Sequence, residues 1–210
     1  MNNIDTYKNL IKAIPIEKQA MHAQKDVWKK RLDSSAFKIV KFLFDEEEAV
    51  ITRSEIFEEK DPQNKIAKVL VWGYPNGGRG NHIQNILKKI DGLSEKLSEN
   101  KNEHLSKDNA RKLIDELNEI DGMGPSTWSK LLYFFKVSVD SNSCQIFDAK
   151  IEKSLNSANF KEFKKDKWDQ HKTDDYFDYI ERLSKVSRKL KVKPEQVENF
   201  LFHYNLNFKL

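Results

Sequence analysis

Apolar residues recur along this chain at intervals of three and four positions, the spacing that places side chains on one face of an α-helix. Polar and charged residues fill the positions between them. Successive apolar stripes begin, in chain order, at Tyr7, Met21, Phe37, Ile66, Ile83, Leu113, Trp128, Ile151, Tyr176 and Val197. The pattern predicts an all-α fold.

The first seventy residues are predicted to hold helices only. One helix covers residues 7–14, a second covers 21–32, and Ser34 is predicted to cap a third. Asp61 followed by Pro62 is a strong start signal for the next helix, because the carboxylate caps the free amides and proline suits the first helical position.

Residues 109–136 predict two helices joined by a tight turn. The two apolar stripes are Leu113, Ile114, Leu117 and Ile120, then Trp128, Leu131, Leu132 and Phe135. The turn between them reads Asp121-Gly122-Met123-Gly124, and Pro125 follows where the second helix would begin. Its two glycines permit left-handed backbone angles and the close approach of another backbone. The facing stripes predict a helical hairpin.

The amides at the start of the second hairpin helix are candidates for binding a phosphate. The N–H groups of Gly124, Ser126 and Thr127 lie at a helix N-terminus, where a phosphate finds unpaired donors and a favourable dipole. An ordinary helix–helix connection explains the same residues equally well, because two glycines one residue apart are a weak signal.

Residues 73–81, Gly-Tyr-Pro-Asn-Gly-Gly-Arg-Gly-Asn, form the least ordinary loop of the sequence. We interpret it as a loop that approaches a ligand closely, with Arg79 as an anion contact and Tyr74 as a stacking or wedging side chain. A surface turn between helices is the alternative. Further on, the polar stretch 92–106 is predicted to connect two lobes.

Length and composition indicate one compact unit over residues 1–210, made of two helical lobes. With 38% hydrophobic residues the chain can bury a real core. The formal net charge of +4 makes the chain mildly basic. The excess of Lys and Arg over Asp and Glu is concentrated in residues 150–193, which is consistent either with a patch that attracts a polyanion or with a solvated charged surface. The acidic run at 45–48 is better explained as a solvated helix end than as a metal site.

The remaining composition indicates a cytoplasmic protein. Cys144 is the only cysteine, which excludes an internal disulfide and a thiolate zinc cluster. No apolar run is long enough for a membrane span, and the sequence near Met1 lacks the pattern of a signal peptide. We expect a monomer without a metal site.

Asp148 follows a loop over 137–148 and precedes a helix with Ile151 and Leu155 on its apolar face. Aspartate is a preferred N-cap residue, which is a sufficient structural explanation. An acid that a loop brings beside a phosphate-binding hairpin is, however, also placed to act on the bound nucleotide.

These segments together resemble a known family. Leu117-x-x-Ile120-x-Gly122-Met-Gly124-Pro-Ser-Thr-Trp-Ser-Lys-Leu-Leu, followed by a loop and Ile146-Phe147-Asp148-Ala149, is similar to the helix-hairpin-helix DNA glycosylases, particularly the branch related to 8-oxoguanine glycosylase. The resemblance covers about forty residues. It implies a two-lobed helical fold with the helix-hairpin-helix at 109–136, and a double-stranded DNA partner whose target base is flipped out of the duplex.

The resemblance also implies roles for individual residues. Gly122 and Gly124 would form the DNA-binding hairpin, and Asp148 would be the catalytic carboxylate. Met123, Ser126 and Thr127 of the same turn, and Arg79 of the 73–81 loop, are the further candidates for DNA contacts. Trp72, Tyr74 and Phe147 are candidates to line the base pocket. The family allows a monovalent cation on the hairpin carbonyls; no other cofactor is expected.

One position departs from the family pattern. Relatives that also cleave the strand carry a lysine where this chain has Ser126, which cannot form an imine. Lys130 lies one helical turn further on the same face and could reach back.

The sequence therefore predicts a monofunctional DNA glycosylase that excises a damaged or modified base, with oxidised purines such as 8-oxoguanine as candidates. A non-catalytic DNA-binding protein is the alternative, and an all-helical protein-interaction domain is a third.

Overall fold

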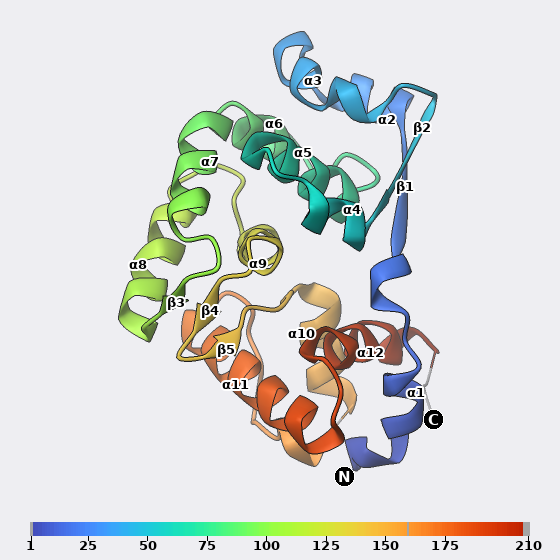
Figure 1. Ribbon diagram of the computed structural model, residues 1–210, viewed down its shortest axis with the longest axis vertical. Coiled ribbons are helices and arrows are strands. Elements are labelled where there is room, and N and C mark those ends of the chain that lie inside the picture. Colours follow the sequence, from blue (N-terminus) through green and yellow to red (C-terminus); the bar gives the residue numbers. More distant parts are fainter. Residues whose placement is uncertain (1, 159, 208–210) are drawn as a thin grey trace.

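Helices dominate the computed structural model, which describes residues 2–158 and 160–207 (Figure 1). The predicted all-α class is confirmed. The α-helices are α1 (Lys8–Lys12), α2 (Lys25–Arg31), α3 (Ser34–Val40), α4 (Arg53–Glu58), α5 (Pro62–Gly73), α6 (His82–Leu87), α7 (Ile90–Glu99), α8 (Lys107–Asn118), α9 (Pro125–Phe134), α10 (Ala149–Ala158), α11 (Thr173–Leu190) and α12 (Pro194–Asn207). The 3-10 helices are η1 (Ile4–Tyr7), η2 (Ile16–Lys18), η3 (Lys41–Leu43) and η4 (Lys161–Phe163). The strands are β1 (Ala20–Gln24), β2 (Glu48–Thr52), β3 (His104–Leu105), β4 (Ser138–Val139) and β5 (Asn142–Ser143).

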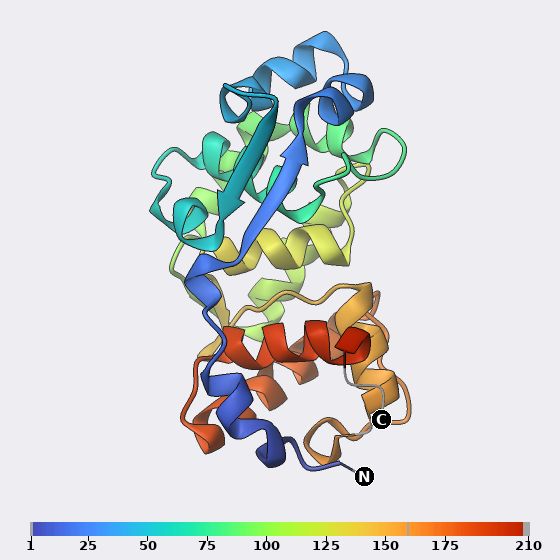
Figure 2. The ribbon, with the colours of Figure 1, turned by 90° about the vertical axis from the view of Figure 1, so that its right-hand side faces the viewer.

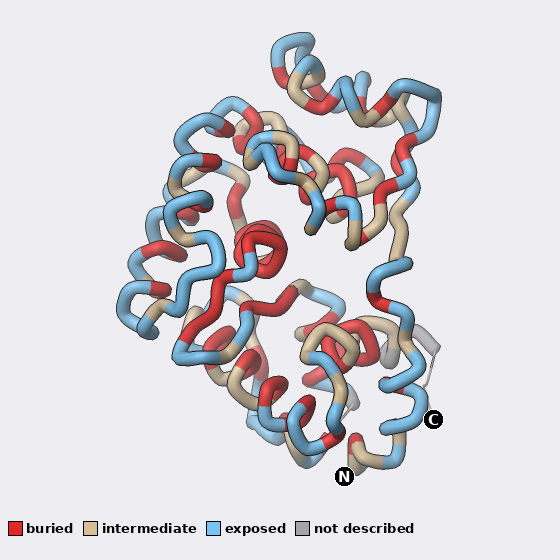
Figure 3. Tube along the Cα trace, viewed as in Figure 1, coloured by how far each residue is buried: buried red, intermediate tan, exposed pale blue. Residues whose placement is uncertain are grey.

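Helix α9 lies at the centre of the molecule. All its residues from Thr127 to Phe134 are buried, and it stands out as a buried coil (Figure 3). Helices α2 to α7 lie on one side of it, whereas α1, α10, α11 and α12 lie on the other (Figure 1). Helix α5 packs against α9, and the Trp128 ring meets Tyr176 of α11 edge-on at 4.8 Å. Both groups of helices therefore rest on α9.

The predicted helix over 21–32 is wrong in its first third. Residues Ala20–Gln24 form strand β1, which pairs antiparallel with β2 from Ala20 opposite Thr52 to Gln24 opposite Glu48. The spacing from Met21 to Val27 does not continue a helical stripe, and Ala23, Ala49 and Ile51 instead turn inward as a strand pair requires. Only Lys25–Arg31 is helical here.

The predicted polar connection over 92–106 is also wrong. Helix α7 covers Ile90–Glu99 and packs on α5, with Ile90, Leu93 and Leu97 buried. These three residues keep the helical spacing, and burying them outweighs the polar composition around them. The chain instead passes between the two groups of helices around residues 13–20 and 136–148 (Figure 1).

The predicted helix starts are mostly correct. The carboxylate of Asp61 accepts a hydrogen bond from the amide of Asn64, and Pro62 lies in the first turn of α5. The hydroxyl of Ser106 caps α8 in the same way. Helix α3 is capped by Asp33 rather than by Ser34, since the Asp33 carboxylate accepts the amide of Ala36 at 2.8 Å. Within the predicted loop over 137–148, Ser138 and Val139 form β4, which pairs with β3 and β5.

Two observations bear on the chemical surroundings of the chain. Cys144 is free and buried, and burial raises the pKa of its thiol to about 12. Within the described residues, every helix is too short or too polar to cross a lipid bilayer.

Candidate active site

A cavity of about 180 Å³ opens where the two groups of helices meet beside α9. One water molecule occupies about 30 Å³ in the liquid, so the cavity can take a much larger group. Its lining comes from β1, α4, α5, α9, α10, α12 and the segments between them, namely Gln19, Met21, Arg53, Trp72, Gly73, Pro75, Lys130, Ile146, Asp148, Lys150, Glu198 and Phe202.

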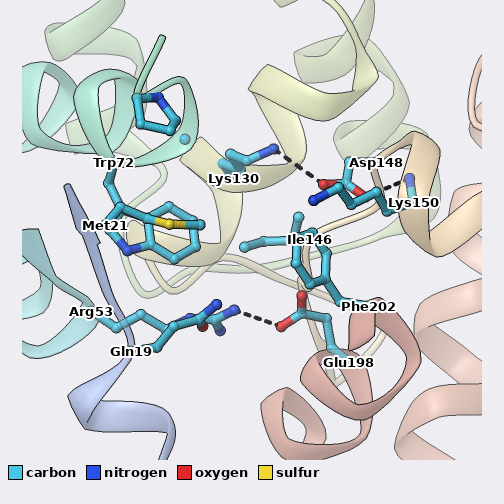
Figure 4. Close-up of a pocket in the computed structure, with 12 residues that line it drawn as sticks. Gln19, Met21, Arg53, Trp72, Lys130, Ile146, Asp148, Lys150, Glu198 and Phe202 are labelled. Atoms are coloured by element: carbon cyan, nitrogen blue, oxygen red, sulfur yellow. Dashed lines mark hydrogen bonds and ion pairs between the residues drawn. The ribbon is translucent and has the colours of Figure 1, made fainter. Parts of the chain in front are cut away.

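The cavity has apolar sides and charged ends (Figure 4). Met21 and Trp72 lie on one side, and Ile146 and Phe202 face them from the other. One end holds Lys130 and Asp148, and the opposite end holds the ion pair of Arg53 and Glu198. Such a slot suits a flat ring whose edges carry polar atoms.

Lys130 folds back along α9 toward Ser126. Its Nζ donates to the carbonyl oxygen and to the hydroxyl oxygen of Ser126, both at 2.8 Å, and lies 3.8 Å from an Asp148 carboxylate oxygen. The side chain of Lys130 is only 5% exposed. The amine thus occupies the space around the side chain of Ser126, the position where the resemblance expects a lysine.

Gly73 and Tyr74 make room for this lysine. A Cβ atom at Gly73 would come within 2.8 Å of Cδ of Lys130, so only glycine leaves space for the methylene chain. The Lys130 ammonium faces the ring of Tyr74 at 5.4 Å, and the Tyr74 hydroxyl bonds the Thr127 hydroxyl at 2.6 Å. The end of α5 and the start of α9 therefore fix the amine together.

Asp148 both caps a helix and lines the cavity. One carboxylate oxygen accepts the amides of Lys150 and Ile151 at 3.0 and 3.1 Å, as an N-cap does. The other oxygen faces Lys130, and the side chain is 15% exposed. The same carboxylate therefore caps α10 and lies beside Lys130 at the cavity.

Arg53 and Glu198 form a buried ion pair at the opposite end. The Arg53 guanidinium donates to Glu198 at 2.9 Å and to the Tyr133 hydroxyl at 3.0 Å, with both charged side chains at most 2% exposed. Burial raises the pKa of the Glu198 carboxyl, and the neighbouring guanidinium opposes that shift. The pair joins α4 to α12 across the cavity.

Two of the residues that line the cavity carry a buried donor that lacks a partner among the described residues. These donors are Nε1 of Trp72 and Nε of Arg53. A buried N–H without an acceptor is costly, so a ligand that supplied a carbonyl oxygen or a ring nitrogen would recover that cost.

A wider groove of about 540 Å³ adjoins the cavity and shares Gly73, Pro75 and Lys150 with it. Its walls are the loop after α5, with Tyr74 and Arg79, and the hairpin between α8 and α9, with Gly122 and Thr127. Three segments distant in sequence therefore meet around connected hollows.

The hairpin turn is pressed against the start of α6. Gly122 has a φ of +88°, and a Cβ atom there would lie 2.5 Å from Cα of His82. Asn85 of α6 donates to the Asp121 carboxylate at 2.7 Å. The close approach expected of this glycine is thus to a neighbouring helix of the same chain.

The turn leaves fewer free amides than the sequence indicates. The Thr127 amide already donates to the carbonyl oxygen of Gly124 at 2.8 Å. Among the described residues, the amides of Gly124 and Ser126 have no acceptor and remain available to a phosphate. Met123 points inward and is 7% exposed.

The carbonyl oxygens of Ile120 and Gly124 in the turn accept the amides of Met123 and Thr127. A monovalent cation bound by the hairpin carbonyls stays a prediction. No cluster of three or more His, Cys, Asp or Glu side chains able to hold a metal occurs in the described parts of the chain.

Of the three predicted pocket residues, Trp72 lines the cavity and Tyr74 lines the adjoining groove. Phe147 lines neither. Its ring is fully buried and stacks on Tyr179 at 4.7 Å, while its amide donates to the Ser129 hydroxyl at 3.1 Å. Since Asp148 faces the cavity, the preceding side chain is directed into the core.

Sequence reasoning did not find Gln19, Met21, Arg53, Glu198 or Phe202. They come from segments up to 183 residues apart, and no motif joins them. Glu198 alone carried a signal, because it stands between Val197 and Leu201 on a helix whose neighbouring residues are apolar, where an unpaired carboxylate would be costly.

Residues 14–202 match the family model described as "Putative 8-oxoguanine DNA glycosylase OGG-like protein". The match spans about nine-tenths of the chain and includes every residue that lines the cavity. No curated protein and no solved structure matches the chain. The extent of the family match agrees with the helical fold and with the resemblance of the hairpin, and the chain therefore belongs to the OGG-like glycosylase family.

Proposed function

We propose that this protein is a DNA glycosylase that takes a base everted from the duplex into the cavity and cuts its N-glycosidic bond. The observation that supports this most is the pairing of Lys130 and Asp148 at one end of a slot with apolar sides. Family membership supports glycosylase-like chemistry and DNA binding, and the geometry supports the location of the reaction.

The proposed path of the DNA follows the two connected hollows. The amides of Gly124 and Ser126 hold a phosphate at the start of α9, and the groove between this hairpin and Arg79 takes the backbone. The everted base then passes Lys150 and enters between Trp72 and Phe202. A flipped base loses its stacking in the duplex, and these apolar sides compensate in part.

Asp148 acts on the sugar in this proposal. As the N-glycosidic bond breaks, its electrons leave with the base, and positive charge develops on the sugar ring. A carboxylate near the cavity wall stabilises that charge, and it can take a proton from an attacking water.

A second reaction mode is favoured by the position of Lys130. Its Nζ reaches the space around Ser126, beside Asp148, so the neutral amine could attack the anomeric carbon in place of water. The resulting imine would permit elimination of the 3′-phosphate and strand cleavage. The sequence predicted a monofunctional enzyme because of Ser126; the position of the lysine makes a bifunctional one the competing proposal.

The base is proposed to carry acceptors toward Trp72 and Arg53 and a donor toward Glu198. An oxidised purine has a carbonyl oxygen and ring N–H groups at its edges and meets this requirement. The first substrate to test is accordingly 8-oxoguanine, within a panel of modified bases in duplex oligonucleotides.

Excision assays with three proteins test the proposal. Wild type should release a base from one duplex of the panel, whereas Asp148→Asn should bind that duplex and release none, because asparagine keeps the cap but not the charge. Lys130→Gln should abolish borohydride trapping of a protein–DNA adduct if the amine forms an imine, and leave base release intact if water attacks.

A non-catalytic DNA-binding protein is the alternative that these assays would reveal. In that case wild type would bind duplexes without producing an abasic site from any member of the panel. Equal base release by wild type and Asp148→Asn would instead reject the role of this acid.

A further inference from the structure

Helix α2 ends with three positive residues beside the loop that follows α5. Lys29, Lys30 and Arg31 are all exposed. None of them forms an ion pair with any acidic side chain that the structure describes, whereas Lys25 at the start of the same helix pairs with Glu47. The unneutralised charge is therefore confined to the C-terminal end of α2.

Close contacts fix this end of α2 to the loop. Nε1 of the buried Trp28 donates to the Pro75 carbonyl oxygen at 3.3 Å. A Cβ atom at Gly77 would lie 2.7 Å from Cγ of Arg31, so the stem of the arginine rests on the loop two residues from Arg79. Figure 2 shows α2 beside this loop, on the side of the molecule where α9 begins.

The next helix is fixed in the same way. The Asp33 amide donates to the Gln84 side chain at 2.7 Å, and the Asp33 carboxylate pairs with Lys88 at 2.9 Å. Since Gln84 and Lys88 belong to α6 and its end, α2 and α3 are held on the elements that form one wall of the groove.

The basic excess of residues 150–193 differs from this cluster, because several of its members are already paired. Lys165 and Arg182 bond to Asp178, Lys185 to Glu181, and Lys189 and Lys193 to acids near the N-terminus. These ion pairs neutralise part of the basic excess of that segment.

A basic end also complements the dipole of its own helix, which explains lysines there without any ligand. That explanation does not account for Arg31, whose stem leaves the helix for the loop. Nor does it account for the contact of Arg31 with the loop that forms one wall of the groove.

We propose that Lys29, Lys30 and Arg31 form a second phosphate-binding surface for duplex DNA, across the groove from the hairpin. This inference rests on the proposed function. The hairpin would hold the backbone next to the everted nucleotide, and the end of α2, with Arg79, would hold the backbone of the flanking duplex. Lysine and arginine contacts to phosphates release counterions, so this surface should contribute to the salt dependence of binding.

The test compares the salt dependence of duplex binding between Lys30→Gln/Arg31→Gln and a matched control, Lys8→Gln/Lys12→Gln, on the distant helix α1. Both changes remove two exposed charges and keep side chains of similar length. The slope of log affinity against log salt should fall by about 0.9 for each lost contact in the first variant only. Arg31→Lys should keep the wild-type slope.

A rate measurement completes the test. With protein in excess and all DNA bound, the double variant should release the base at the wild-type rate, because its residues do not line the cavity. The proposed surface would be contradicted if the salt slope of the double variant stayed at the wild-type value. It would also be contradicted if the slope fell equally in the control, or if the double variant released the base more slowly than wild type. Absence of duplex binding by wild type would instead reject the proposed function.

Discussion

At the scale of single residues, the candidate site depends on where one lysine amine lies. Lys130 is directed to Ser126 and Asp148 because Gly73 has no side chain and Tyr74 offers its ring. The motif around the hairpin predicted the acid and the possibility of a displaced lysine. It could not predict Gly73, since a glycine at the end of a helix is ordinary until its neighbour is known.

Gly73→Ala tests whether this space matters. The added methyl group would meet Cδ of Lys130 and displace the amine, and a shift of about 1 Å can lower a rate on the order of 100-fold. We expect slower single-turnover excision with unchanged DNA affinity. Gly92→Ala is the control, because a Cβ there meets nothing within 4 Å. Equal rates for both variants would show that Lys130 needs no such space.

The buried amine of Lys65 should make the free energy of unfolding depend on pH. Burial lowers its pKa from 10.5 to about 8, and its Nζ donates only to the Phe57 carbonyl oxygen among the contacts described. Nearby Lys101 and Lys136 lower the pKa further, whereas Glu59 raises it. Between these two pKa values the unfolded chain binds more protons than the folded chain, so the free energy of unfolding rises with pH in that window.

Lys65→Met should remove this contribution. The variant should be more stable than wild type at pH 7, and the difference should shrink as pH rises from about 8 toward 10. Urea unfolding at several pH values measures it, with the exposed Lys60→Met as the comparison. A difference that stays constant with pH would show that the buried amine keeps its ordinary pKa.

At the scale of elements, helices with a clear start signal and a regular stripe were predictable. Asp61-Pro62 and the glycine–proline turn at 124–125 are examples. Strand β1 was not, because its five residues with one buried alanine give little alternation, and its pairing partner β2 lies 24 to 32 residues further along the chain. Helix α7 was missed for the opposite reason, since a polar composition obscured a correct stripe.

The contact between the hairpin turn and α6 yields a prediction at this scale. Gly122→Ala puts a side chain at positive φ and 2.5 Å from the His82 backbone, so the turn must move away from α6. We expect the free energy of unfolding to fall by about 1–3 kcal/mol from backbone strain. Gly124→Ala, where a Cβ meets nothing within 4 Å, should be much milder in thermal unfolding. Similar melting temperatures for both would contradict the contact.

At the scale of the whole molecule, the two groups of helices meet on α9 and are joined by the Arg53–Glu198 pair across the cavity. No sequence pattern could have predicted this pair, because its members stand 145 residues apart and only Glu198 lies among apolar positions of its helix. The same holds for the apolar sides of the cavity, which combine strand β1, helices α5 and α12 and the segment before α10.

Removing both partners of this pair should cost less stability than the sum of the two single removals. Arg53→Met leaves a buried carboxylate without its partner, and Glu198→Leu leaves a buried guanidinium without its partner. Each single variant should lower the free energy of unfolding by about 3–5 kcal/mol. The double variant should lose clearly less than the sum in denaturant unfolding. Additive losses would mean that the two charges do not depend on each other.

The burial of Phe147 has a consequence for how such a protein can diversify. The residue before Asp148 is anchored between Tyr179 and Ser129, outside the cavity, so the position of the acid does not depend on which side chains surround the base. If the proposed function holds, substitutions at Met21, Trp72 and Phe202 should change the preferred base while Asp148 stays where it is.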